Sequence, residues 1–431
     1  MTQTYRQFIF EDYAFDVSAK TLSLRYSFDG EVPFMEQFRF DFDFAAYDPT
    51  LLDRACQNLF FMAGVSYYKA YQPTEIAVKK GTLDAGSAAF FSKTYQRGLG
   101  EFFYVNRLDP RTPVTFPVTG DAPPEAPIVQ TGNGLLVGIG GGKDSLVSVE
   151  LLRGKIDSLA TWSVNHRPQL EPLIKHIGLP HYWVERMFDT SLLEHNARGA
   201  RNGHIPISAI LASVGAVVAV LSARRDIVVS NEHSANEPTL HYNGVAINHQ
   251  YSKSQEFEAD FQTQLQRTLG SHVRYYSLLR GLGELRIAEL FGRNWFATYH
   301  HVFSSCNRAF TFDQHRLFWD GTCAKCAFTF LALTPFVPQE KLEALFSGKN
   351  LLQTPALEPT YRQLLGIEGD KPLDCVGEIK ESRAAMRLAA QIYPELTAKY
   401  QAELPVDYNY KAPDGHLVPP DIYAKITIPQ D

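Results

Sequence analysis

A run of glycines that ends in Lys-Asp-Ser is the stretch of this chain best suited to chemistry, and it follows a short apolar segment in LLVGIGGGKDS, residues 135–145. Successive glycine N–H groups can form a nest for an anion, and the N-terminus of a following helix adds partial positive charge. Lys143 supplies a cation, Ser145 a hydrogen-bond donor, and Asp144 a ligand for Mg²⁺. The stretch therefore predicts a phosphate site made by Gly140, Gly141, Gly142, Lys143, Asp144 and Ser145.

The spacing of these residues excludes two common phosphate-binding loops. A Walker A loop needs glycine where this chain has Val137, and Ser or Thr where it has Asp144. A dinucleotide-binding loop needs its third glycine at the position of Lys143. The remaining arrangement is a strand, consecutive glycines, Lys-Asp-Ser and a helix, and it fits a pyrophosphate that is bound and then expelled.

A second polar stretch, residues 230–258, begins where a predicted strand ends. The carboxyl ends of parallel strands meet at one edge of a sheet, so its first residues should face the same crevice as the glycine loop. A solvated loop with a helix cap at Ser254 would explain only one or two of the hydrogen-bonding side chains before it. We expect a substrate site formed by Asn231, Glu232, His233 and Ser234 together with Asn248, His249, Gln250, Tyr251, Ser252 and Lys253.

Three cysteines lie close together in the sequence, and two of them have the C-x-x-C spacing of zinc knuckles. Cys306, Cys323 and Cys326 would supply three ligands, with His315 or His301 as the fourth. Three interpretations stay open: a structural Zn²⁺ site, reduced cysteines that only pack, and a thiol that carries a proton in the active site.

Composition and charge restrict the class of protein. The chain has 431 residues, a net charge of −6 and no Lys/Arg-rich run, which counts against nucleic acid as a partner and favours a small-molecule substrate. The longest apolar stretch, residues 205–221, is interrupted by proline, serine and glycine, so no membrane span is expected. The N-terminus does not have the pattern of a signal peptide, and five cysteines suit a reducing compartment. We expect a cytoplasmic protein, of undecided oligomeric state, in which Cys56 and Cys375 are structural.

Alternating apolar residues predict a β-rich N-terminal segment. Residues 21–28 and 37–44 have the period of half-buried strands with turn residues between them, so an antiparallel hairpin is expected, followed by a helix at 51–64. Six prolines between Asp109 and Pro127 indicate a domain boundary. We expect a smaller α+β domain over residues 1–108 and a Pro-rich linker over 109–133.

Beyond this linker the pattern alternates between strand and helix, which implies an α/β fold with a parallel, doubly wound sheet and ligands at the carboxyl ends of its strands. Strands are expected at residues 135–139, 159–164, 181–186, 226–230 and 294–304, and helices at 145–154, 168–177 and 205–225, with a further helix entered at Cys323. A catalytic domain that contains the glycine loop is expected over residues 134–337, and a helical or irregular extension over 338–431.

The glycine loop resembles that of the PP-loop ATP pyrophosphatases, whose fingerprint is Ser-Gly-Gly-x-Asp-Ser after the first strand of an adenine-nucleotide α-hydrolase-like (HUP-type) domain. Residues 140–145 match it except that Gly140 stands where the family usually has Ser. The resemblance implies ATP and Mg²⁺ as cofactors, with Asp144 as a magnesium ligand. It also implies attack of a substrate oxygen on the α-phosphate, which gives an adenylate and pyrophosphate.

Further motifs narrow the resemblance to the MurL family of UDP-N-acetyl-muramoyl-L-alanyl-L-glutamate epimerases. These are the glycine loop with Asn-His-Gln-Tyr-Ser-Lys-Ser at residues 248–254, GVSYYKAY at 64–71, YQRGLGEFFYVN at 95–106 and CAKCAFTFLALTPF at 323–336. The resemblance implies epimerisation of the terminal L-glutamate of UDP-MurNAc-L-Ala-L-Glu to D-glutamate for peptidoglycan, with release of AMP and pyrophosphate.

This chemistry makes physical sense, because a Cα–H bond beside an ionised carboxylate is a very poor acid, and a mixed anhydride with AMP removes that charge. We expect Lys143 and Asp144 to assist the departure of pyrophosphate. A base on one face and an acid on the other would then exchange the α-proton. The candidates are His249 first, then His233, Glu232, Lys253 and the cysteines, while His249 as a substrate-binding residue stays equally open.

Two alternatives belong to other classes of function. An amidating or thiolating PP-loop enzyme of nucleobase or tRNA modification, similar to 7-cyano-7-deazaguanine synthase, would share the loop and a zinc-bound cysteine cluster. The acidic charge balance and the motif at residues 248–254 do not support it. An adenine-nucleotide sensor would have no use for so dense a polar site.

Overall fold

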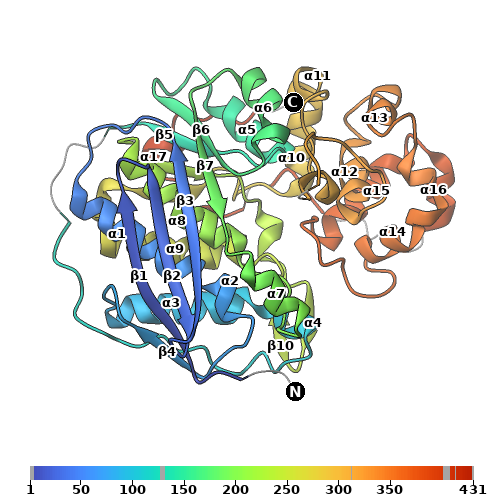
Figure 1. Cartoon of the computed structure of the whole chain (residues 1–431). Coiled ribbons are helices and arrows are strands. Elements are labelled where there is room, and N and C mark those ends of the chain that lie inside the picture. The colour runs from blue at the N-terminus through green and yellow to red at the C-terminus, as the bar shows by residue number, and fades with distance from the viewer. Residues whose placement is uncertain (1–3, 127–131, 312, 401–407, 413, 430–431) are drawn as a thin grey trace.

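A nine-stranded sheet runs through the molecule and contains strands from residues 7–78 as well as strands from residues 135–277 (Figure 1). The computed structural model describes residues 4–126, 132–311, 313–400, 408–412 and 414–429. The strand order is β11-β8-β5-β6-β7-β3-β2-β1-β4, in which the five strands from β11 to β7 are parallel. The protein is therefore an α/β protein with a mixed, mostly parallel sheet.

The parallel strands have the order of a doubly wound sheet. They are β5 (Leu135–Gly138), β6 (Leu159–Val164), β7 (His181–Met187), β8 (Asp226–Val229) and β11 (Arg274–Ser277). The connections run outward from β5 to β7 on one side and from β8 to β11 on the other, so the order reverses between β5 and β8. The crevice outside the carboxyl ends of such a pair is where open α/β sheets bind ligands. Four of these strands were predicted from the sequence, and β11 was not.

Helices cover both faces of the parallel strands. On β5 the side chain of Leu136 belongs to one hydrophobic core cluster, whereas Leu135 and Val137 belong to the other. Alternate burial of this kind requires apolar cover above and below, which explains the continuous apolar run of the strand. The covering helices include α5 (Lys143–Leu152), α6 (Arg167–Ile177), α8 (Ile207–Leu221) and α9 (Gln255–Leu269), of which the first three were predicted.

The N-terminal strands extend the parallel sheet. β1 (Gln7–Asp16), β2 (Thr21–Phe28) and β3 (Val32–Asp41) form an antiparallel meander, β4 (Glu75–Val78) pairs with β1, and β3 pairs antiparallel with β7. The predicted hairpin is confirmed, although its second strand begins at Val32 and ends at Asp41. The smaller α+β region expected at the N-terminus thus has no sheet of its own, since its strands are hydrogen-bonded into the larger one.

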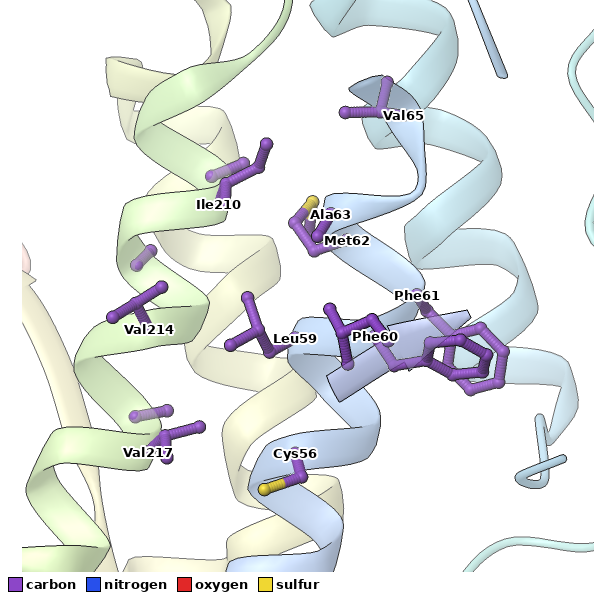
Figure 2. Close-up of a cluster of buried hydrophobic side chains, with 14 of the residues drawn as sticks. Cys56, Leu59, Phe60, Phe61, Met62, Ala63, Val65, Ile210, Val214 and Val217 are labelled. Carbon is purple, nitrogen blue, oxygen red and sulfur yellow. The ribbon is translucent and has the colours of Figure 1, made fainter. Parts of the chain in front are cut away.

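The apolar core also joins the two ends of the sheet. Helix α1 (Pro49–Ala63) packs against α8, and the side chains of Leu59 on α1 and of Ile210 and Val214 on α8 meet between them (Figure 2). Asp48 caps α1 through hydrogen bonds to two backbone amides of its first turn. Because α8 also packs on β5 and β8, one core is shared by the N-terminal strands and the parallel strands.

The strand predicted over residues 294–304 is wrong. The chain forms α10 (Glu284–Leu290), one π-helical turn (Phe291–Trp295) and α11 (Phe296–Tyr299), followed by a loop. The aromatic residues of this segment favour strands in sequence-based prediction, and a π turn inserts an extra residue that hides the helical period of the buried positions. Phe291, Phe296 and Phe303 pack together instead as part of a helical core.

The helices between residues 324 and 400 gather at one side of the molecule, away from β1 and β4, whereas the last helix of the chain lies apart from them beside β11, where Asp421 pairs with Arg274 (Figure 1). Among the described residues, no helix combines the length and the apolar character that a membrane crossing requires. The gathered helices are α12 (Ala324–Leu333), α13 (Gln339–Leu345), α14 (Glu358–Leu364), α15 (Ile379–Ala390) and α16 (Pro394–Tyr400), and the last helix of the chain is α17 (Pro420–Tyr423). The remaining short elements are α2 (Val65–Tyr68), α3 (Ala85–Gly98), α4 (Gly100–Val105), α7 (Ser191–Ala197), β9 (Leu240–Tyr242) and β10 (Val245–Ile247).

If one core joins α1 to the parallel sheet, its disruption should destabilise the whole molecule. We expect Leu59→Ala, which leaves a cavity between α1 and α8, to lower the free energy of unfolding by about 2–5 kcal/mol. Urea unfolding followed by circular dichroism and by tryptophan fluorescence should give coincident shifts. Leu193→Ala, the same change at a side chain that is 54% exposed, is the matched control and should be nearly neutral. Separate transitions for the two probes would contradict the shared core.

Candidate active site

The glycine loop and the polar stretch after β8 lie at the point where the strand order reverses. The loop follows β5, and Glu232 follows β8 three residues after the strand ends. A carboxylate oxygen of Glu232 lies within 4.8 Å of one on Asp144. Glu232 therefore faces the same crevice as the loop, which is the position that the strand pattern predicts for it.

The glycines of the loop have different roles. Gly141 has a φ of +94°, and a Cβ atom there would come within 2.9 Å of the Phe310 ring, so this position requires glycine. Gly140 is exposed, and a Cβ atom there would meet nothing within 4 Å. Gly142 is the N-cap of α5, and the hydroxyl of Ser145 donates to its carbonyl oxygen at 3.1 Å. The loop thus leaves open space over Gly140, directly before the start of a helix.

Lys143 is buried and bridges two carboxylates. Its ammonium donates to Asp144 Oδ1 at 2.5 Å and to Glu284 Oε2, which comes from the first turn of α10. Burial alone would lower the pKa of Lys143, but the two carboxylates outweigh burial and raise it. Burial raises the pKa of Glu284, whereas Lys143 holds the pKa of Asp144 below its usual range despite burial. Lys143 is therefore charged at any physiological pH.

Three carboxylates converge next to this lysine. One oxygen each from Asp144, Glu232 and Glu284 lies within 4.8 Å of the others, and Glu232 and Glu284 are buried. Hard oxygen donors of this kind are the ligands that Mg²⁺ prefers. The sequence singled out Asp144 and Glu232 but not Glu284, which lies 141 residues from Lys143 and has no neighbouring motif.

A buried arginine fixes two parts of the polar stretch at residues 230–258 relative to each other. The guanidinium of Arg280 has no exposed surface and donates to the carbonyl oxygens of Glu232, at 2.6 Å, and Lys253. Its Nε donates to Glu258 at 3.0 Å, and Glu258 also accepts the backbone N–H of Ser277. Arg280 escaped the sequence prediction, because a lone arginine after a strand that was itself not predicted gives no signal.

Lys253 lies between the thiol of Cys375 and the carboxylates of Glu232 and Asp144. Its ammonium donates to Cys375 Sγ at 3.1 Å, and it also interacts electrostatically with Glu232 and Asp144. Burial would lower the pKa of Lys253, but these neighbours raise it, Cys375 most strongly. Cys375, which was predicted to be structural, lies at the edge of this site.

His249 extends the site away from the glycine loop. Its Nδ1 contacts Glu101, and its Nε2 lies 3.9 Å from Cys375 Sγ. Burial would lower the pKa of His249, but hydrogen bonds with Cys375 and Glu101 raise it to about 9. The neighbouring His204, whose ring centroid is 4.5 Å from that of His249, has its pKa lowered to about 4, chiefly by burial. His249 is therefore protonated at neutral pH and His204 is not.

Other residues predicted for the substrate site lie around this cluster with different partners. His233 points toward the C-terminal region, where its ring nitrogens lie 3.8 Å from Glu378 and 3.4 Å from Asp414. The hydroxyl of Ser234 contacts Glu232 at 3.4 Å, and the side chain of Asn231 interacts with Tyr275. The structure brings Glu232 and Ser234 to the crevice, and it directs His233 elsewhere.

The stretch from Asn248 to Ser252 is held mainly by its own hydrogen bonds. Asn248 donates to the Ala235 carbonyl at 2.8 Å and accepts from the Gln250 N–H at 2.7 Å. The buried ring of Tyr251 packs against Phe257. Gln250 and Ser252 are also buried, and Ser254 caps α9, so part of this motif shapes the loop that presents His249 and Lys253.

A cavity of about 730 Å³ opens beside these clusters at the carboxyl ends of β6 and β7. Its lining includes Trp183, Arg186, Phe310, Lys69 and Asn202. Lys69 is largely buried, and its ammonium donates to Asn202 Oδ1 at 2.5 Å. Burial lowers the pKa of Lys69 to about 8. The lining thus combines aromatic rings and cations with two carboxylates, those of Asp41 and Glu185, which pair with arginines.

The three clustered cysteines converge as predicted, but the fourth group is Asp320. Cys323 Sγ lies 3.4 Å from Cys326 Sγ, which lies 3.1 Å from Asp320 Oδ1, and one ligand atom from each of the four residues, Cys306 included, lies within 4.8 Å of the rest. Neither His301 nor His315 belongs to this group, and both are exposed. Cys323 is the N-cap of α12, so the predicted helix entry is confirmed. The cluster can bind a metal ion.

Comparison with known proteins gives a consistent result. Two family models match the chain, the MurL N-terminal domain over residues 1–278 and the MurL C-terminal domain over residues 302–403. The UDP-N-acetyl-alpha-D-muramoyl-L-alanyl-L-glutamate epimerase of Xanthomonas oryzae pv. oryzae is 38% identical over 391 residues, which are 89% of this chain and 85% of that protein. The proteins of the same name from Salinispora tropica and a Micromonospora species are also 38% identical, over 398 and 391 residues that make up 89% of this chain and 85% and 87% of theirs.

The two neighbouring glycines of the loop give a matched test of its geometry. We expect Gly141→Ala to lower the free energy of unfolding by about 1–3 kcal/mol, because it forces alanine to a positive φ against the Phe310 ring. Gly140→Ala should be neutral or slightly stabilising, since its Cβ atom enters open space. Urea unfolding of both variants measures the difference, and equal losses would show that the loop has another conformation.

Proposed function

This chain belongs to the MurL family, and from that premise we propose that it epimerises the terminal L-glutamate of UDP-MurNAc-L-Ala-L-Glu to D-glutamate for peptidoglycan synthesis. The identity to relatives of that name extends over 89% of the chain and at least 85% of theirs. The observation that carries the chemistry is the convergence of an open glycine loop, three carboxylates and Lys143 at one crevice.

The reaction needs a way to acidify the α-carbon. Removal of a proton next to a carboxylate would create two adjacent negative charges, so we infer that the carboxylate is first converted to a mixed anhydride with AMP. An oxygen of the α-carboxylate forms a bond to the α-phosphorus of ATP, and the bond to pyrophosphate breaks. The resulting acyl group can accept the electron pair of the C–H bond, and water later hydrolyses the anhydride to release AMP.

The glycine loop supports a nucleoside triphosphate as the second substrate. It thereby also supports assignment of the chain to the PP-loop type. The space over Gly140 lets phosphate oxygens approach the backbone N–H groups, and α5 begins at the next turn with its partial positive charge. Ser145 can turn its hydroxyl from the Gly142 carbonyl to a phosphate oxygen. The nearby cavity of about 730 Å³ supports binding of a large anionic nucleotide substrate.

The carboxylate group supports a magnesium ion at the crevice. Asp144, Glu232 and Glu284 would hold Mg²⁺, which when bound offsets the charge of the leaving pyrophosphate. Lys143 favours the ionised form of Asp144 and opposes the effect of burial on the pKa of Glu284, and it is itself a cation next to the loop. Candidates for proton transfer to and from the α-carbon are Lys253, Glu232 and His249, which face the same crevice or its edge.

The amidating or thiolating alternative predicts a different product. It would consume ATP with a nucleobase substrate. The relatives, which this chain matches over 85% to 87% of their length, are named as epimerases. The cysteine cluster, which that alternative shares, lies in the segment matched by the MurL C-terminal domain. The cluster therefore does not favour nucleobase chemistry.

The function is tested by incubation of the protein with ATP, Mg²⁺ and UDP-MurNAc-L-Ala-L-Glu. We expect AMP and pyrophosphate together with D-glutamate after acid hydrolysis, measured by chiral chromatography. Asp144→Asn should lower the rates of AMP release and of D-glutamate formation by about 100-fold or more, because it removes one carboxylate of the proposed metal site.

Asp157→Asn, the same change at an exposed residue after α5, is the control. Lys143→Ala is a less clean test, because it would also leave two carboxylates without their cation. No AMP and no D-glutamate would overturn the proposal, and ADP with phosphate would overturn the formation of an anhydride with AMP, because those products arise from an acyl phosphate.

We also propose that the cysteine cluster holds a structural Zn²⁺ ion. Three thiol groups and one carboxylate are a donor set that suits tetrahedral zinc. Protein purified without chelators should contain about one zinc per chain by elemental analysis, consistent with one such cluster. Cys323→Ala should lose the metal and Cys56→Ala, which changes a core cysteine elsewhere, should keep it. Wild-type protein without metal would contradict this assignment.

A further inference from the structure

Cys375 differs from the other four cysteines in its surroundings. Cys56 is a core residue, and Cys306, Cys323 and Cys326 belong to the metal-type cluster. Cys375 is a free thiol, is only partly buried and lies in the segment before α15. Its sulfur meets nitrogen atoms of Lys253 and His249, which belong to one other segment of the chain and are 122 and 126 residues away in sequence. Local packing does not require such a meeting.

Positive charge surrounds this sulfur. Lys253 Nζ lies 3.1 Å from it, His249 Nε2 lies 3.9 Å away, and Lys325 donates to the backbone carbonyl of Cys375. Burial would raise the pKa of the thiol, but Lys253, His249 and Lys325 lower it to about 6. The group is therefore mostly a thiolate at neutral pH, beside a histidine that carries a proton.

The thiolate also lies near the chemistry proposed above. Lys253 interacts with Cys375 on one side and with Glu232 and Asp144 on the other, so a single side chain separates the sulfur from the carboxylates at the glycine loop. The carbon to be deprotonated is bonded directly to the activated carboxyl carbon. A base for this carbon must therefore lie near the phosphate-binding residues but not among them, as Cys375 does.

We propose that Cys375 is the base that removes the α-proton of the activated glutamyl group. This proposal rests on the proposed function. The C–H bond breaks, its electron pair moves to the acyl oxygen to give an enolate, and the proton forms an S–H bond on Cys375. A proton that exchanges with water reaches the opposite face of the carbon, and the thiol returns its own proton to water. Atoms and charge then balance without any further reactant.

His249 is a positioning residue in this scheme. Its Nδ1 contacts the Glu101 carboxylate, which leaves Nε2 to face the sulfur. The order carboxylate, imidazole and sulfur resembles the way in which enzymes orient and activate nucleophilic thiols. The first choice for proton transfer from the sequence, His249, thus acts through Cys375. Cys375, the proposed base, does not belong to any of the motifs found in the sequence.

The first experiment compares Cys375→Ser and Cys375→Ala with wild-type protein and with the cysteine control Cys56→Ala. We expect both Cys375 variants to form D-glutamate at least about 100-fold more slowly. AMP release that depends on UDP-MurNAc-L-Ala-L-Glu should remain within about threefold of wild type, because activation does not use the base. In D₂O the variants should return L-glutamate without deuterium at the α-carbon.

The outcomes separate this inference from the function it rests on. Wild-type protein without substrate-dependent AMP release would overturn the proposed function itself. An active wild type with undiminished D-glutamate formation by Cys375→Ser would overturn the role of Cys375 alone. Equal loss of AMP and D-glutamate would indicate a structural role, and a hydroxylamine-sensitive acyl group on Cys375 would indicate a nucleophile instead of a base. Either result would also overturn the inference.

The second experiment measures alkylation of Cys375 by iodoacetamide against pH, with peptide mapping by mass spectrometry. The rate should rise with pH and level off above a midpoint near 6, because the thiolate reacts and the thiol does not. His249→Gln should move this midpoint upward, since it removes a cation that faces the sulfur. A wild-type midpoint near that of an ordinary thiol, about 8.5, would contradict the charge state that the proposal requires.

Discussion

The geometry of the site depends on one buried ammonium group. Lys143 is the first residue of α5 and Glu284 the first residue of α10, so their ion pair joins the starts of two helices that belong to different segments of the chain. Moving such charges out of water costs several kcal/mol each, and removing one partner leaves the other uncompensated. The pair therefore contributes little net stability, but it restricts where the glycine loop can lie relative to the core under α10. A loop that must hold phosphate at its backbone needs this kind of restriction more than it needs strength.

Arg280 applies the same principle to the backbone. Its guanidinium has no exposed surface and donates to the main-chain carbonyls of Glu232 and Lys253, in two parts of the polar stretch at residues 230–258, and to the Glu258 carboxylate. Five N–H donors in a rigid plane can hold two loops at a fixed separation, which no flexible ammonium group can do. Glu232 and Lys253 are thereby placed on either side of one guanidinium. The acidic group at the crevice and the cationic group at its edge keep their distance because the same side chain holds both.

The sequence predicted what depends on local pattern. Four parallel strands, the glycine loop and the place of Glu232 follow from apolar periodicity, glycine spacing and the rule that ligands bind where a doubly wound sheet reverses. It could not predict which distant segments meet. Glu284, Arg280 and Cys375 reach the site from 22 to 141 residues away from their partners, and none stands in a recognisable motif. The pairing of β3 with β7 was also hidden, because an alternating strand shows the same pattern whether its second neighbour is solvent or another strand. The π turn at Phe291–Trp295 broke the helical period that would have excluded a strand.

The segment before α15 connects the C-terminal region to this chemistry through charge. Lys371 pairs with Glu237 at 2.6 Å, Asp374 accepts from Asn307, and the Cys375 carbonyl accepts from Lys325. Lys325 in turn lies 3.8 Å from Glu284, the partner of Lys143. Lys325 therefore holds the segment by its carbonyl, adds positive charge near the thiol and links the segment to Glu284 at the crevice. A shift of this segment would change the position of Cys375 and its charge state together. The reactivity of the thiol is therefore coupled to the position of the segment through Lys325, in addition to the effect of Lys253 and His249.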